Sequence, residues 1–451
     1  MELEKTTLYH EVIDTFFNDQ HPGDVRYEAA LYTDTEGTSV PIFDVEMIST
    51  QKDYLNNTAD EIGMQIRLSF GNYAINVYPY RTTLRVGLKQ ITTTVLTSTD
   101  DNTVPPVEKF YCAVLIEEYP ALTQMQGMVA KDIHSLDQLG MFTLKLQLFD
   151  IQVQRLRATQ VGDNYRQVPV QALIQGALAK SLAQVKPDPT AASYSVDVQP
   201  VDNTIIREQI PVKHGVNVLD LPNWLQNKIG VYASGLGSYI DNQCWYVYRL
   251  YDTTRFNQSK RTLSIYVLPP NRFPEIEKTY SAKDDGTLSI LSIGRVDFRG
   301  DNDIGYISKG NGVRYAPADV IDQFTVNGDG KAVASGQNNT RQFLSQQRGD
   351  GLIQAPVKAA VFTANPFTSY SELAQRKGGM VRLQWRNSKA SLLTPGMPVR
   401  IIYYDKDDTK QTFGVLLAAS EMAIKAGGVK SDKYTTNAML QIFANLEDQT
   451  Q

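Results

Sequence analysis

The chain has 451 residues, of which 42% are hydrophobic and 21% are charged, a composition typical of folded globular proteins and unlike that of disordered or collagen-like chains. Its 44 Lys and Arg residues against 49 Asp and Glu residues give a net charge of -5, so composition gives no support to nucleic-acid recognition or to binding of an anionic membrane. The charged first residues and the lack of a long apolar run lead us to expect neither a signal peptide nor a membrane span. The length predicts several domains.

Residues 1–149 are predicted to form a first β-barrel. Short apolar and aromatic runs separated by turn residues predict successive strands, at Arg26–Thr33, Val40–Ile48, Gly63–Leu68, Asn72–Pro79, Thr82–Thr97 and Phe110–Glu117. Met141–Leu148 alternates apolar and polar residues with period two, which predicts one closing strand. The 24 Tyr and 16 Phe residues of the chain also favour sheets over a helical bundle.

Residues 150–298 are predicted to form an α+β connecting domain. Apolar residues between Val170 and Leu178 recur at helical spacing, with Pro169 at the first turn, which predicts a short amphipathic helix. The other predicted elements are a strand, a second helix and the two strands of a hairpin, at Ser195–Gln199, Val218–Ile229, and Cys244–Tyr251 with Arg261–Leu268.

Residues 299–356 are rich in Gly, Asn, Asp, Gln and Ser, which predicts a long loop or extension. Residues 357–451 are predicted to form a second β-barrel, with strands at Val357–Phe362, Met380–Trp385, Val399–Tyr404, Thr412–Ala418 and Leu440–Phe443. The expected fold class is therefore mainly β, with two β-barrels flanking a mixed α+β domain.

The sequence lacks the motifs of common catalytic and cofactor sites. No phosphate-binding Gly-x-x-x-x-Gly-Lys-Ser/Thr loop and no Gly-x-Ser-x-Gly nucleophile motif occurs. The four histidines are scattered and form no local zinc or iron motif; they are His10, His21, His134 and His214. Cys112 and Cys244 lie in apolar aromatic runs, where we interpret them as buried, reduced thiols. We expect no catalytic residue, no cofactor and no bound metal, and therefore no enzyme.

Three stretches taken together resemble the baseplate hub proteins of contractile-tailed bacteriophages. The first contains Leu156–Thr159 and Tyr165–Val168 with the helix that follows them. The longest is Ile210–Tyr280, whose matching segments come in the family's order and are Gly230–Tyr239, Trp245–Tyr248, Tyr251–Phe256 and Pro269–Pro274. The third contains Asn365–Phe367, Val381–Trp385, Pro395–Arg400 and Gly414–Leu417. Residues 299–351 take no part in the resemblance.

The resemblance implies a virion structural protein that acts as a homotrimer. Each chain of that family supplies two barrels related to the tail-tube subunit, so three chains would form a ring of six barrels. Such a ring would join the six-fold tail tube to the three-fold central spike and would contact other baseplate proteins. The tube-like barrels would be residues 24–149 and 357–445. The protein would lie in the tail baseplate after assembly in the host cytoplasm, with no nucleic-acid sequence recognition.

Seven residues from the matching segments are candidates for contact with partner proteins, because aromatic residues and Arg are enriched at interfaces. They are Trp245, Tyr246, Tyr248, Arg255, Phe256, Arg272 and Trp385. Aromatic residues also fill cores, so an ordinary buried strand is the favoured interpretation of the run Trp245–Tyr248, ahead of direct contact with a partner. Trp224, Trp245 and Trp385 lie in apolar patterns that predict core positions.

Other functions stay open from the sequence. A baseplate wedge or tube-associated protein would share the β-rich composition without needing a three-fold ring. A hub with peptidoglycan-hydrolase activity in residues 299–351 is disfavoured, because this segment has no Glu and no His and too few apolar residues to enclose a pocket. A carbohydrate- or receptor-binding module would need exposed Trp and Tyr side chains.

Overall fold

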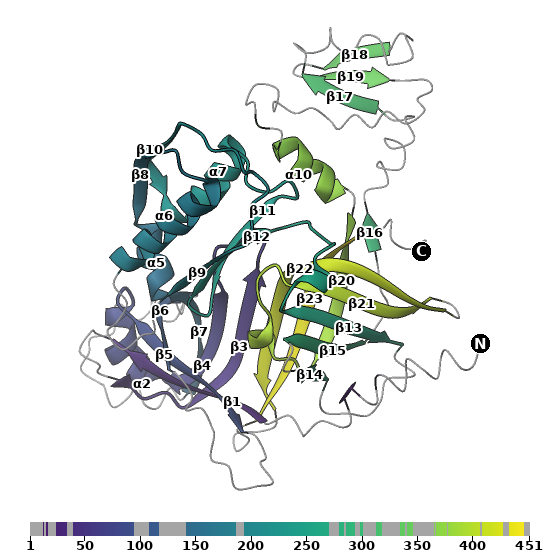
Figure 1. The fold of residues 1–451 in the computed structure, drawn as a ribbon. Coiled ribbons are helices and arrows are strands. Elements are labelled where there is room, and N and C mark those ends of the chain that lie inside the picture. Colours follow the sequence, from purple (N-terminus) through teal and green to yellow (C-terminus); the bar gives the residue numbers. More distant parts are fainter. Residues whose placement is uncertain are drawn as a thin grey trace.

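The chain forms one large mixed sheet and three smaller sheets (Figure 1). The computed structural model describes residues 24–33, 39–93, 108–116, 141–185, 194–269, 279–283, 286–293, 298–300, 313–317, 334–338, 341–345, 365, 367–376, 378–405, 408–426 and 433–445, together with Val12, Thr15 and Phe16. The statements below concern these residues.

Six strands close into a β-barrel. In order around the barrel they are β13 (Thr262–Leu268), β15 (Thr287–Ile293), β20 (Gly378–Arg386), β23 (Tyr434–Asn445), β22 (Asp408–Lys425) and β21 (Pro398–Asp405). β13 runs parallel to both of its neighbours, and the other neighbouring strands are antiparallel. Successive side chains of a strand point to opposite faces, so Leu383 and Trp385 of β20 fill the interior while Gln384 and Arg386 are exposed.

The first part of the chain forms an antiparallel sheet. Its strands, in spatial order, are β3 (Asp44–Asp53), β4 (Glu61–Ser69), β7 (Met141–Asp150), β6 (Lys109–Leu115), β5 (Arg85–Thr93), β1 (Asp24–Tyr32) and β2 (Ser39–Val40). Buried residues alternate along β4 and pair with buried residues of β7, as in Met64 opposite Leu146. A closed first barrel was expected. Among the described residues it is an open sheet, because the pairings end at β2 and β1 does not pair with β3.

The strand predicted at residues 72–79 is helical, so that prediction was wrong. Three short helical segments follow one another here, α2 (Phe70–Asn72), η1 (Tyr73–Val77) and η2 (Tyr78–Tyr80). The Ser69 hydroxyl accepts a hydrogen bond from the Asn72 N–H at 3.3 Å, which caps the first turn. Tyr73 and Val77, four residues apart and both fully buried, lie on one helical face, and this burial decides the conformation of a sequence that is also compatible with a strand.

Strand β22 joins the first sheet to the barrel. Its first half pairs with β21, and its second half pairs with β3 from Ala418 opposite Asp53 to Ile424 opposite Met47. Near the end of the strand the Lys425 ammonium lies 2.7 Å from the Asp44 carboxylate on β3. The two β-rich parts therefore share one hydrogen-bonded sheet, although more than 360 residues separate the paired segments.

The middle of the chain is α+β, as predicted. Its elements are α5 (Ile151–Arg157), β8 (Gln160–Arg166), α6 (Val170–Gln184), β9 (Ser195–Val198), β10 (Gln209–Asn217), η5 (Val218–Asp220), α7 (Leu221–Lys228), β11 (Leu236–Asp241), β12 (Cys244–Arg249) and η6 (Phe256–Gln258). β8 pairs with β10, and β12 lies between β11 and β9. The predicted helix at Val170 is confirmed as α6, whose buried face contains the expected Leu173, Ile174 and Leu178.

The predicted hairpin of Cys244–Tyr251 with Arg261–Leu268 was wrong. β12 pairs with β11 and β9, whereas β13 pairs with β15 and β21 inside the barrel. All seven residues of β13 are buried, as is typical of a strand covered on both faces. Both β13 and β15 fall within the range 150–298 expected to form the connecting domain, and the structure places them in the barrel instead.

The segment after β15 contains regular structure where a loop or extension was predicted. β16 (Phe298–Gly300) pairs with β20, and β17 (Val313–Pro317), β19 (Arg341–Ser345) and β18 (Ala334–Asn338) form a separate antiparallel sheet. Figure 1 shows this small sheet apart from the barrel, beyond α10 (Phe367–Arg376). The strand predicted at residues 357–362 lies outside the described residues.

Candidate functional site

The turn between β3 and β4 lies where the first sheet, the barrel and the middle domain meet. Asp53 begins the turn, because its carboxylate accepts the N–H groups of Leu55 at 3.1 Å and Asn56 at 3.0 Å. The Tyr54 N–H donates to the Leu417 carbonyl of β22 at 2.9 Å. The turn is thereby bonded to itself and to the barrel.

The same turn is bonded to β11 of the middle domain. The Ile240 N–H donates to the Thr58 carbonyl at 2.8 Å, and the Tyr239 hydroxyl donates to Asp60 Oδ1 at 2.9 Å. The Tyr54 and Tyr239 rings pack edge to face with centroids 4.8 Å apart, a favoured aromatic geometry. Burial, followed by the nearby Asp60 carboxylate, raises the pKa of the Tyr239 hydroxyl far above its ordinary value, so this hydroxyl keeps its proton and acts as a donor.

A buried ionic cluster lies under the turn. The Lys52 ammonium is 2.9 Å from Asp241 Oδ2 and 3.2 Å from Asp60 Oδ2, and the Lys52 and Asp241 side chains are each 4% exposed. Burial alone would lower the pKa of Lys52, but the carboxylates of Asp60 and Asp241 outweigh it and raise that pKa well above its ordinary value. Burial and the second carboxylate raise the pKa of Asp241 despite Lys52. One ammonium therefore serves two carboxylates between β3 and β11.

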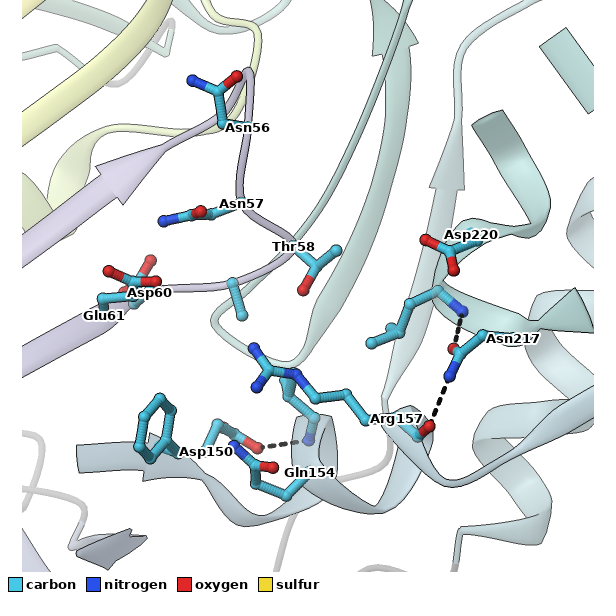
Figure 2. Close-up of a pocket in the computed structure, with 14 residues that line it drawn as sticks. Asn56, Asn57, Thr58, Asp60, Glu61, Asp150, Gln154, Arg157, Asn217 and Asp220 are labelled. Atoms are coloured by element: carbon cyan, nitrogen blue, oxygen red, sulfur yellow. Dashed lines mark hydrogen bonds between the residues drawn. The ribbon is translucent and has the colours of Figure 1, made fainter. Parts of the chain in front are cut away.

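A polar cleft of about 280 Å³ opens beside the turn. Figure 2 shows that the turn forms one wall and that α5 and the start of η5 form the others, with the Arg157 side chain reaching between them. The labelled polar lining consists of Asn56, Asn57, Thr58, Asp60, Glu61, Asp150, Gln154, Arg157, Asn217 and Asp220.

Two lining residues of this cleft have structural roles. Asp150 Oδ1 accepts the N–H groups of Gln152 at 2.8 Å and Val153 at 3.1 Å, which caps α5. Burial raises the pKa of Asp150, and these two N–H groups partly offset the rise. Asn217 accepts the Leu219 N–H at 2.9 Å and donates to the Arg157 carbonyl.

Among the described residues, no three His, Cys, Asp or Glu side chains are grouped so that they could hold a metal ion. No helix within the described ranges is long and apolar enough to span a membrane.

Four of the predicted contact residues are buried within the chain. Trp245 and Trp385 are 1% and 0% exposed. Their indole N–H groups donate to Ser238 Oγ at 2.9 Å and to Thr279 Oγ1 at 3.0 Å. Both tryptophans therefore occupy the predicted core positions. Trp224, also expected in a core, is only partly buried against the middle domain.

Tyr248 and Arg255, the other two buried residues, connect the parts of the chain. The Tyr248 hydroxyl donates to the Tyr54 carbonyl in the turn at 3.0 Å. Arg255 Nη2 donates to the Arg249 carbonyl at 3.1 Å and to the Gly396 carbonyl before β21 at 3.0 Å. Arg255 thus links the end of β12 to the barrel.

The remaining three predicted residues differ in placement. Tyr246 is half-buried, and burial together with Cys244 raises its pKa to about 12. Phe256 packs against Phe413 at 5.6 Å between centroids, and the Arg400 guanidinium lies 5.2 Å from its ring centroid. Arg272 lies outside the described residues. Contact with a partner protein stays a prediction for all seven.

Sequence reasoning missed the ionic cluster. Lys52 and Asp241 are 189 residues apart, so no local motif could reveal them. One signal was usable. Lys52 lies four residues after Ile48 on β3, so the two side chains point to the same buried face. A buried charge requires a partner.

No family model and no curated protein matches the sequence. Three solved structures are similar to this chain over most of its length. A 43 kDa tail protein of prophage MuSo2 from Shewanella oneidensis is 9% identical with a TM-score of 0.45, covering 93% of this chain and 98% of its own. A tail protein from Neisseria meningitidis is 10% identical with a TM-score of 0.42, and the match covers 92% of this chain and 96% of that protein. The third is an E. coli component of the type VI secretion system, described as structurally similar to bacteriophage T4 tail proteins. It is 10% identical with a TM-score of 0.42, and the match covers 94% of this chain and 77% of that protein. The chain is thus similar to phage tail and type VI secretion proteins.

Proposed function

We propose that this chain is a structural component of a bacteriophage tail baseplate, a homotrimeric hub that joins the six-fold tail tube to the three-fold central spike. The observation that carries the proposal is the presence of two β-rich parts in one chain, joined through the shared strand β22. Three such chains would contain six β-rich parts. A three-fold ring of these chains can therefore match a six-fold tube on one side and a three-fold spike on the other.

The continuity of the chain supports a role as a rigid connector. β7 ends at Asp150 and α5 begins at Ile151, so no linker separates the first sheet from the middle domain. The β3–β4 turn, the Lys52 cluster and Arg255 bond the middle domain to both β-rich parts. A hub that connects a tube to a spike requires such fixed relative positions.

The sequence resemblance of residues 156–280 and 365–417 to baseplate hub proteins supports the same role. The partners would be a tail-tube protein, a central spike protein and other baseplate proteins, within the virion. The half-buried Tyr246 and Phe256 remain candidates for these contacts. The role requires no catalysis, no cofactor and no nucleic-acid sequence recognition.

Mass and symmetry of the purified protein test this proposal. Sedimentation and negative-stain class averages should give a three-fold ring with a mass of three times 50.4 kDa. The ring should bind one end of purified tail-tube polymers, and a β-rich protein of similar mass serves as the binding control. A chain that stays monomeric, or a trimer that binds no tube end, would contradict the hub assignment.

A further inference from the structure

The buried ionic cluster holds an amine and a carboxyl group in direct contact. The Lys52 ammonium lies 2.9 Å from Asp241 Oδ2, and both side chains are 4% exposed. Groups that a fold fixes in contact react far faster than the same groups free in solution. An amine beside a carboxyl group provides the two reactants of an amide bond.

Asp60 supplies a third group that can carry a proton. Its Oδ2 lies 3.2 Å from the Lys52 nitrogen, while its Oδ1 accepts the Tyr239 hydroxyl at 2.9 Å, so Tyr239 fixes one oxygen and the other faces the amine. Against the lowering effect of burial, the carboxylates of Asp60 and Asp241 raise the pKa of Lys52 well above its ordinary value. The amine therefore becomes nucleophilic only when a neighbouring group takes its proton, and Asp60 is in contact with it.

Burial favours the uncharged product over the ion pair. Removing two opposite charges from water carries a desolvation cost, and burial raises the pKa of Asp241 despite Lys52. An amide between the two side chains carries no charge, and their burial largely excludes the water that would hydrolyse it. Asp60 is more open, with a side chain 25% exposed, and it lines the polar cleft (Figure 2). A water molecule released at the cluster can leave through this cleft.

We propose that Lys52 and Asp241 condense to an isopeptide bond, with Asp60 as the proton carrier. Asp60 takes one proton from the Lys52 ammonium and passes it to the Asp241 carboxylate, and the neutral amine attacks Asp241 Cγ. A second amine proton then moves to the hydroxyl of the tetrahedral intermediate, which leaves as water. One N–C bond forms and one C–O bond breaks, so an ammonium and a carboxylate become a neutral amide and one water molecule, with no oxidation or reduction.

The isopeptide bond joins β3 covalently to β11, between residues 189 positions apart. It fixes the middle domain on the first sheet at the place where the β3–β4 turn already bonds the two parts. The inference does not depend on the proposed trimer, because the three reacting side chains belong to one chain. Failure of either proposal leaves the other standing.

Intact-mass spectrometry of the denatured full chain tests this inference. The wild-type mass should lie one water molecule below the mass of the sequence. Trypsin does not cleave after an acylated lysine, so it should release a branched peptide that joins residues 27–67 to residues 229–249. The Lys425 ammonium, 2.7 Å from Asp44, is the internal control. No second carboxylate among the described residues pairs with Lys425, and this pair should stay unlinked.

Three variants assign the chemistry to the cluster. Lys52→Arg keeps the positive charge without the amine and should have the full mass of its sequence. Asp60→Asn keeps both reacting groups and should slow bond formation about 100-fold, so that freshly purified protein stays mostly unlinked. Asp44→Asn makes the same change at the control pair and should leave the bond intact. Circular dichroism and thermal unfolding check that the variants fold.

A folded wild-type chain with the full mass of its sequence overturns the inference. A loss of water that maps to other residues, or that persists in Lys52→Arg, also overturns it. A bond that forms in Asp60→Asn as fast as in wild type, or that is lost equally in Asp44→Asn, overturns the role given to Asp60.

Discussion

Lys52 and Asp241 are 189 residues apart in sequence, yet the Lys52 ammonium donates a hydrogen bond to the Asp241 carboxylate at 2.9 Å in a buried site. Lys52 belongs to β3 and Asp241 ends β11, so this pair fixes the middle domain on the first sheet. Asp60 from the β3–β4 turn shares the same ammonium at 3.2 Å. This lysine therefore adds a buried ionic link to a junction that the Ile240–Thr58 and Tyr239–Asp60 hydrogen bonds also hold.

Lys52→Met should destabilise the protein by about 3–5 kcal/mol, because it leaves the buried Asp241 carboxylate without a counter-charge. Urea unfolding measures the change, and the exposed Lys180→Met is the control, expected within about 0.5 kcal/mol of wild type. Adding Asp241→Asn to Lys52→Met should recover part of the loss, because the two side chains interact directly. Strict additivity of the two substitutions would contradict the proposed coupling.

Glu421→Gln should change how stability depends on pH. Glu421 Oε1 accepts Ser388 Oγ at 2.7 Å and the Ala390 N–H at 2.8 Å, and Gln keeps an acceptor there. Burial raises the native pKa of Glu421 above 4.5, despite these hydrogen bonds. The native state therefore holds this proton more tightly than the unfolded chain, and the stability from this group falls as pH rises from 4.5 through the native pKa.

The stability of Glu421→Gln relative to wild type should accordingly increase from acid to neutral pH. Chemical denaturation at a series of pH values measures this difference. Glu208→Gln is the control, because Glu208 is exposed and the same change is made there. If the stability of Glu421→Gln relative to wild type stays constant or decreases as pH rises, the pKa of Glu421 is not raised in the native state.

Gly230→Ala should be much more costly than Gly215→Ala, although both glycines have positive φ, 84° and 88°. A Cβ at Gly230 would lie 2.3 Å from the Phe367 ring, whereas a Cβ at Gly215 meets nothing within 4 Å. We expect a loss of about 1 kcal/mol at Gly215 from backbone strain and about 3 kcal/mol at Gly230 from strain and overlap together. Denaturant unfolding of both variants measures this, and equal losses would show that α10 does not pack on Gly230.

Arg255→Lys should destabilise the link between β12 and the barrel by about 1–3 kcal/mol. Arg255 Nη2 donates to the carbonyl groups of both Arg249 and Gly396, while Nε donates to the Asp252 carbonyl at 3.4 Å. A lysine side chain is one bond shorter, and its single nitrogen cannot occupy both positions. The exposed Arg261→Lys provides the matched control. Thermal unfolding compares the two variants. An unchanged unfolding temperature in Arg255→Lys would argue against this link.

The sequence by itself predicted the features that arise from local patterns. The helix at Val170 was found because apolar residues recur at helical spacing. The strand Met141–Asp150 was predicted at Met141–Leu148, because apolar and polar residues alternate there with period two. The strand Gly378–Arg386 was predicted at Met380–Trp385, a short run rich in apolar residues. Both patterns depend only on neighbours along the chain, and they sufficed for the mainly β class with an α+β middle.

Only the tertiary structure decided which strands pair and which charges meet. β13 reads as an apolar strand in any context, and its burial on both faces selects the parallel neighbours β15 and β21 over the expected hairpin with β12. β22 bonds to β3, although a gap of several hundred residues separates them. Lys52 meets Asp60 and Asp241 for the same reason. Long-range pairing follows from the free energy of burying whole surfaces, which no local window of sequence contains.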